Sequence, residues 1–83
     1  MSQTLADAVR YLERGDWQAA HPIVQDDDSD LGAWAHAIVH MQEGDMSNAR
    51  YWFRRAHRSF PAEDSARAEI AALAAAVSAA SEP

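Results

Sequence analysis

The sequence predicts one all-α domain, because three kinds of observation agree along its 83 residues. Apolar residues recur three and four positions apart, and no segment alternates as a strand would. Glycine and acidic residues, which can end and cap helices, stand between these apolar stretches. The pattern of one stretch also returns about 29 residues later. We therefore expect about five helices, arranged as two hairpins and a final helix, in a single domain over residues 1–83.

The first helix is expected to begin after Thr4, which forms a capping-box pattern with Asp7 three residues later. Its apolar residues follow the i, i+3, i+4, i+7 pattern of one helix face: Leu5, Ala8, Val9 and Leu12. Gly15 ends this helix, and Asp16 is suited to cap the next one. The apolar residues of the second helix are Trp17, Ala20, Ile23 and Val24.

A proline interrupts this second helix. Pro22 lies six positions after Asp16 and removes the backbone hydrogen bond to the Gln18 carbonyl, at a cost of up to about 3 kcal/mol. The residue before a proline, here His21, is also biased away from helical dihedral angles. We expect the second helix to be kinked or to begin later than Trp17.

The acidic run Asp26-Asp27-Asp28-Ser29-Asp30 is expected to be a solvated linker whose last residue caps a third helix. That helix should extend from about Leu31 to Glu43. Its apolar face contains Trp34, Ala37, Ile38 and Met41. Gly44-Asp45 repeats the earlier turn and begins a fourth helix, which Phe60-Pro61 ends. The fourth helix has its apolar residues at Ala49, Trp52, Phe53 and Ala56.

A capping helix is expected over about residues 62–79. It should start near Ala62, since Glu63 and Asp64 suit the positive end of a helix dipole. Its apolar residues are Ile70, Leu73, Ala74 and Val77.

The internal repeat indicates two copies of one helix-turn-helix unit. A shift of 29 residues places Gly15-Asp16 on Gly44-Asp45 and Ala20 on Ala49. The same shift pairs Ala6 with Ala35, Ala8 with Ala37, Val9 with Ile38 and Val24 with Phe53.

The second copy resembles a tetratricopeptide repeat (TPR) through Gly44-Asp45, then Ala49-x3-Phe53-x2-Ala56 and Pro61. The first copy keeps Tyr11, Gly15, Trp17, Ala20 and Val24 of this pattern. The resemblance implies two TPR-like hairpins, about 4–28 and 31–60, and a small adaptor that binds a protein, a peptide or a second copy of itself. Residues 34–55 are also similar to short uncharacterised bacterial proteins, a similarity that implies no activity.

The chain departs from the TPR pattern at its histidines. Where the family's first helix has leucine and tyrosine facing a partner helix, this sequence has His36 and His40. Because they are four residues apart, both imidazoles lie on one helix face. They can bind a divalent transition metal, with His21, Glu43 or His57 as the third ligand. They can instead be structural groups that hydrogen-bond to Asp7, to Tyr11 or to the carbonyl freed by Pro22.

A row of arginines is the second candidate site. Arg50, Arg54 and Arg58 recur every four residues, with Arg55 beside them. One interpretation is recognition of a carboxylate, a phosphate or an acidic peptide. The other is a solvated face balanced by the Asp26–Asp30 run, in exposed pairs worth about 0–1 kcal/mol each.

The aromatic residues of the chain are expected to be mainly core. Tyr51 and Trp52 are neighbours on one helix, so one of them should be substantially exposed, as interface residues are. The partner-binding residues expected are therefore Arg50, Arg54, Arg58, Tyr51 and Trp52.

Composition excludes several classes of function. The chain has no cysteine, which excludes disulfides, thiol catalysis and thiolate metal sites. Its net charge of −6 argues against nucleic acid as a partner. No phosphate loop, nucleophile motif or paired catalytic carboxylate is present, so we expect no enzyme activity, no catalytic residue and no cofactor other than the alternative metal ion. Without an apolar segment typical of a signal peptide or membrane span, a cytoplasmic location is expected.

Overall fold

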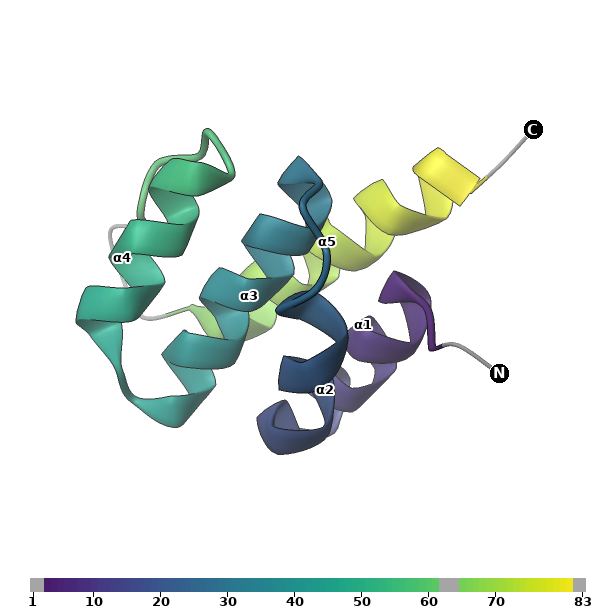
Figure 1. Cartoon of the computed structure of the whole chain (residues 1–83), viewed down its shortest axis with the longest axis horizontal. Helices are drawn as coiled ribbons and strands as arrows, with labels where there is room; N and C mark the ends of the chain where they lie inside the picture. Colours follow the sequence, from purple (N-terminus) through teal and green to yellow (C-terminus); the bar gives the residue numbers. More distant parts are fainter. Residues whose placement is uncertain (1–2, 62–64, 82–83) are drawn as a thin grey trace.

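A computed structural model describes residues 3–61 and 65–81 of the chain, and it is all-α within these ranges. Its five helices are α1 (Leu5–Glu13), α2 (Trp17–Val24), α3 (Asp30–Glu43), α4 (Met46–Arg55) and α5 (Ala66–Ser81). The predicted class and number of helices are thus confirmed for the described residues. Figure 1 shows α3 between the α1–α2 pair and α4, with α5 running behind it. The predicted start of the last helix, at Ala62 to Asp64, lies outside the described residues.

The predicted capping box at the start of α1 is confirmed. The Thr4 hydroxyl accepts from the Asp7 backbone N–H at 3.3 Å, and the Asp7 carboxylate accepts from the Thr4 N–H at 2.9 Å. These two bonds satisfy two of the backbone donors that every helix N-terminus leaves free.

The turns after α1 and α3 have the same backbone structure. Gly15 and Gly44 adopt φ angles of +76° and +91°, which a residue with a Cβ disfavours. The N–H groups of Asp16 and Asp45 each donate back across the turn at 2.9 Å, to the carbonyls of Tyr11 and His40 respectively. This is the hydrogen bond of a Schellman motif. The expectation that the two glycines occupy equivalent turns is therefore confirmed.

The helices that follow these turns also begin alike. Asp16 caps α2 and Asp45 caps α4, each through its side-chain oxygen. Ala20 and Ala49 lie at matching positions four residues further on, and both are fully buried. Both alanines are thus buried at equivalent positions of the two hairpins, as close helix contacts there require.

Pro22 does not delay α2, contrary to one of the two expectations. The helix begins at Trp17, and His21 lies inside it. The Asp16 cap holds its start, and the His21 carbonyl accepts from the Gln25 N–H at 3.0 Å beyond the proline. Local capping and the burial of Ala20 and Val24 therefore outweigh the bias of the residue before a proline.

The N-cap of α3 is Ser29. We had expected Asp30 from the sequence, and that prediction was wrong. The Ser29 hydroxyl accepts from the Gly32 N–H at 3.0 Å, and Asp30 is the first helical residue. The Asp27 carboxylate accepts from the Ser29 N–H at 2.9 Å, which holds Ser29 in the extended conformation of a cap. Both residue types are good caps, so the choice depended on this neighbouring carboxylate.

The core is organised around α3. Every residue from Gly32 to Met41 is buried, although the sequence predicted burial of one face only. The reason is that α3 packs against all four other helices. The last helix, α5, lies across α1 and α3 and buries Ile70, Leu73 and Val77. The Trp34 indole N–H also donates to the Glu69 carboxylate of α5 at 2.9 Å.

By contrast, α4 packs against α3 and no other helix among the described residues. Its buried residues are Ala49 and Phe53, and Trp52 is half-buried. None of the helices described has both the length and the apolar character needed to cross a membrane.

Candidate functional site

Three histidines meet where α2 packs on α3. His36 and His40 lie one turn apart on α3 and are buried, and His21 of α2 is half-buried beside them. One ring nitrogen from each lies within 4.8 Å of the other two. The ring centroids are 5.0 Å (His36–His40), 5.1 Å (His21–His36) and 5.7 Å (His21–His40) apart. Of the three candidate third ligands, it is His21 that lies with His36 and His40.

His40 is oriented by a carboxylate. Its Nδ1 lies 2.8 Å from Oε1 of Glu43, one turn further along α3. A carboxylate can only accept, so Nδ1 of a neutral His40 carries the hydrogen and Nε2 carries the lone pair. Glu43 was considered as a metal ligand from the sequence, and its observed contact is with the histidine ring. Glu43, His40 and Asp45 also form a second close group of donor atoms at the solvent edge of the cluster.

His36 has an unusual environment. One face of its ring stacks on Trp52 of α4, with centroids 3.9 Å apart and planes 13° apart. Its Nδ1 is buried and has no hydrogen-bond partner among the described residues. Burial, and to a smaller extent the charges of His40 and His21, together lower the pKa of His36 from 6.5 to about 4. The ring is therefore neutral at pH 7.

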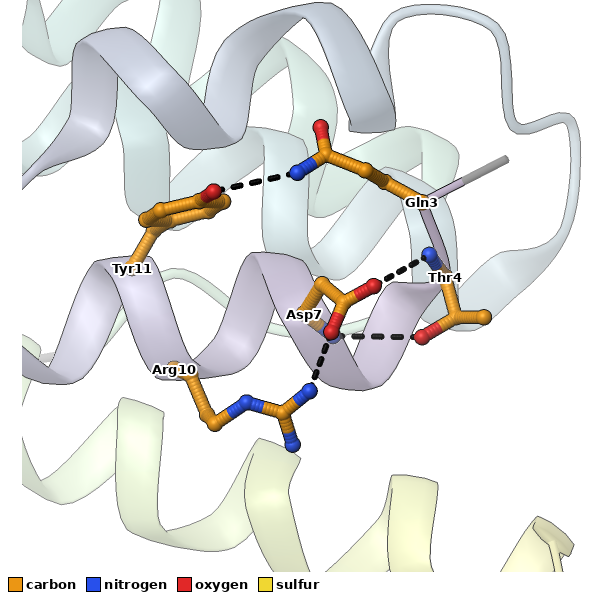
Figure 2. Close-up of polar contacts among 5 residues, drawn as sticks. All are labelled: Gln3, Thr4, Asp7, Arg10 and Tyr11. Atoms are coloured by element: carbon orange, nitrogen blue, oxygen red, sulfur yellow. Dashed lines mark hydrogen bonds and ion pairs between the residues drawn. The ribbon is translucent and has the colours of Figure 1, made fainter. Parts of the chain in front are cut away.

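Two of the hydrogen-bond partners expected for these histidines, Asp7 and Tyr11, are engaged elsewhere. Figure 2 shows Asp7 engaged with the Thr4 backbone and with Arg10, and the Tyr11 hydroxyl accepting from the Gln3 amide at 3.0 Å. Asp7 and Tyr11 are on α1, and their side chains are used within that helix and its N-terminal flank. The expectation that they satisfy the histidines is therefore wrong.

The fourth histidine is separate from the cluster. His57 follows α4, and its side chain is 79% exposed and lies 3.4 Å from the Asp30 carboxylate. It is therefore not the third ligand.

Three of the four arginines on α4 and in the segment that follows it contact aromatic rings. The Arg58 guanidinium lies 3.6 Å from the centroid of the Trp34 ring, and that of Arg50 lies 4.2 Å from the Phe60 ring. Arg55 lies 5.4 Å from the Trp52 ring. Neither the three arginines of α4 nor Arg58 after it forms an ion pair with a described residue. All four side chains are exposed, as a solvated face would be, and the one ion pair of the Asp26–Asp30 run among the described residues joins Asp30 to His57.

The expectation for the adjacent aromatic pair is confirmed. Tyr51 is 43% exposed, whereas Trp52 is half-buried against His36. The stacking of Trp52 on His36 was not predicted, because no local pattern connects residues sixteen positions apart on different helices.

Comparisons of the chain with protein-family models, with curated proteins and with solved structures found no match. The resemblance to tetratricopeptide repeats therefore stays a prediction from the sequence.

Proposed function

We propose that this protein is a small binding module that recognises an acidic segment of a partner protein through the arginines of α4 and of the segment that follows it: Arg50, Arg54, Arg55 and Arg58. The observation that carries this proposal is a charge imbalance. Residues 46–60 contain four arginines and no acidic residue. This segment contributes +4 to a net charge of −6, so the rest of the chain contributes −10.

The position of α4 supports this proposal. Because the helix packs against α3 alone, the side opposite α3 is free of other helices among the described residues. The surface of α3 itself is covered on all sides, so a groove over α3 is not open to a peptide. We therefore assign the expected peptide-binding role to α4.

The aromatic contacts of the arginines favour recognition of carboxylates. A guanidinium held over an aromatic ring keeps its N–H donors available, and it loses less side-chain freedom when it binds. Arg50 and Arg58 are held in this way, and the exposed Tyr51 adds an aromatic surface beside them. The excess negative charge over the rest of the chain disfavours a phosphate backbone as the partner.

The proposal is tested with a fluorescein-labelled 12-residue peptide of alternating glutamate and alanine, and with its glutamine counterpart as the control probe. Binding is measured by fluorescence anisotropy at low and high salt. We expect the acidic peptide alone to bind, more weakly as salt screens the charges.

A pair of triple variants locates the surface. One is Arg50→Gln, Arg54→Gln, Arg58→Gln, and the matched control is Arg10→Gln, Arg14→Gln, Arg67→Gln. Each lowers the net charge by three, from −6 to −9. At about 0.3–1 kcal/mol for each exposed contact, the α4 variant should lose about tenfold in affinity and the control much less. Equal losses would show that only net charge matters.

Self-association is examined in the same proteins by sedimentation velocity. A dimer that disappears in the α4 variant would identify a second copy as the occupant of this face. The alternative function expected from the sequence, metal binding, concerns the histidine cluster and is independent of α4 recognition.

A further inference from the structure

We propose that His21, His36 and His40 bind one divalent transition-metal ion of the Zn²⁺ type, as three neutral imidazole ligands with a fourth position left for water or an external group. This inference goes beyond peptide recognition. It rests on the histidines between α2 and α3 and does not depend on the arginines of the proposed binding surface.

The spacing of the three rings suits a single ion. With metal–nitrogen bonds of about 2.0–2.1 Å, tetrahedral geometry places ligand nitrogens about 3.4 Å apart and imidazole centroids about 5 Å apart. Here the nitrogens lie within 4.8 Å of one another and the centroids are 5.0–5.7 Å apart. Small side-chain rotations therefore bring the three nitrogens to bonding distance without moving a helix.

The helices hold the ligands in place. His36 and His40 are separated by one turn of α3, a rise of about 6 Å, which directs both rings to one face. Because α3 is packed by four helices, these two ligands sit on the most constrained element of the fold. His21 comes from α2, so a bound ion connects the first hairpin to the second.

Without a bound ion, the histidine cluster leaves a buried polar atom unsatisfied. Within residues 3–61 and 65–81 the buried Nδ1 of His36 finds no hydrogen-bond partner, and an unsatisfied buried polar group costs about 1–3 kcal/mol. An apolar side chain of similar size would avoid this loss. Coordination through Nδ1 gives this nitrogen the partner that it lacks among the described residues.

The contact between Glu43 and His40 matches the support that metal-bound histidines receive. A carboxylate that accepts from one ring nitrogen fixes the tautomer and increases the basicity of the other. With Nδ1 of His40 held by Glu43, Nε2 is the nitrogen available to the ion. Loss of such a support lowers metal affinity by about 10–100-fold.

The donor set defines the class of ion. Three imidazole nitrogens suit Zn²⁺, Ni²⁺ and Cu²⁺, whereas Mg²⁺ and Ca²⁺ require oxygen ligands. The half-buried position of His21 leaves the cluster open on the α2 side, where the fourth ligand can enter.

The experiment uses the full chain purified without a histidine tag. Zn²⁺ is titrated by isothermal calorimetry and, independently, in competition with a chromophoric chelator; Mg²⁺ is the control ion. We expect one Zn²⁺ per chain and no binding of Mg²⁺. Absence of Zn²⁺, Ni²⁺ and Cu²⁺ binding to the wild-type chain would overturn the proposal.

Single histidine variants assign the ligands. His21→Gln removes the ligand nearest the surface and should lower Zn²⁺ affinity at least about tenfold, as should His36→Gln and His40→Gln. His57→Gln is the matched control, since it removes the one histidine outside the cluster and should leave the affinity unchanged. Circular dichroism of each variant establishes that it is folded. If His36→Gln or His40→Gln does not fold, the Zn²⁺ affinities of His21→Gln and His57→Gln still test the site. Equal affinities in these two variants would refute it.

Two further variants separate this site from the neighbouring acidic group of Glu43 and Asp45. Glu43→Gln should weaken Zn²⁺ binding by about tenfold while one ion per chain still binds. Asp45→Asn should leave the affinity unchanged. Binding that is lost with Glu43 and Asp45 but retained in His21→Gln would place the ion elsewhere and refute the three-histidine site.

Discussion

Two consecutive helices of the same hairpin, α3 and α4, differ sharply in what they bury. In α3 ten residues in succession are buried, two of them histidines. In α4 only Ala49 and Phe53 are buried, and its arginines lie in solvent. The difference follows from the number of neighbours, since α3 has four packing helices and α4 has one. Polar groups on α3 must therefore be satisfied inside the protein, whereas those on α4 are available to a partner.

The largest expected effect is on stability, and it tests the burial of Phe53, the large side chain of α4 that is fully buried. Phe53 is fully buried, so Phe53→Ala should lower the free energy of unfolding by about 3–5 kcal/mol through lost burial and a cavity. Urea denaturation measures this loss. The control is Tyr51→Ala on the exposed face, which should change stability by less than about 1 kcal/mol. Similar losses in the two variants would contradict the assigned faces of α4.

A second variant tests the close approach of α4 to α3. Ala49 is fully buried at the start of α4, so Ala49→Leu should overpack the contact and cost about 1–3 kcal/mol. Ala72→Leu on the exposed side of α5 is the control for the same substitution at a helical site. An unchanged thermal midpoint for Ala49→Leu would show that Ala49 does not contact α3.

The third prediction concerns how stability depends on pH through His36, a buried polar residue of α3. Burial lowers the pKa of His36 from 6.5 to about 4, with His40 and His21 acting in the same direction. As pH falls below 6.5 the unfolded chain binds a proton that the folded chain excludes. Stability attributable to His36 is therefore full above pH 6.5 and falls between about pH 6.5 and 4.

Urea denaturation at a series of pH values, with a chelator present, measures this dependence. His36→Leu should show a smaller loss of stability over that range than the wild type. The charged and titratable groups facing His36 are His21, His40 and, through His40, Glu43, and they are the same in both proteins. Parallel pH profiles would mean that His36 is protonated as easily in the folded chain as in the unfolded one.

The smallest expected effect concerns the two glycine turns. Gly15→Ala and Gly44→Ala should each cost about 1 kcal/mol, because both residues have positive φ angles. A Cβ at either position would meet no other atom within 4 Å, so the loss comes from the backbone alone. Thermal denaturation should therefore give similar shifts for the two variants. Clearly unequal shifts would mean that the two turns are not energetically equivalent.

Features that depend on local chemistry could be predicted from the sequence. The number of helices, the capping box at Thr4, the two glycine turns and the exposure of Tyr51 next to Trp52 all depend on residues within about four positions of each other. The cap of α3 was predicted wrongly for an equally local reason, since Ser29 and Asp30 are both good caps. Of the two effects expected of Pro22, a later start of α2 does not occur, because Asp16 caps the helix at Trp17.

The tertiary structure alone decided which helices touch, and with that the character of both proposed sites. Helical spacing placed His36 and His40 on one face, but only the packing of α2 on α3 brought His21 to them. The side chains of Asp7 and Tyr11 instead bond to Thr4 and Gln3. The stacking of Trp52 on His36 and of Arg58 on Trp34 likewise joins residues on different elements. Periodicity assigns each helix a face. The burial of α3 on every side depends on how many helices surround it, and that number is a property of the whole fold.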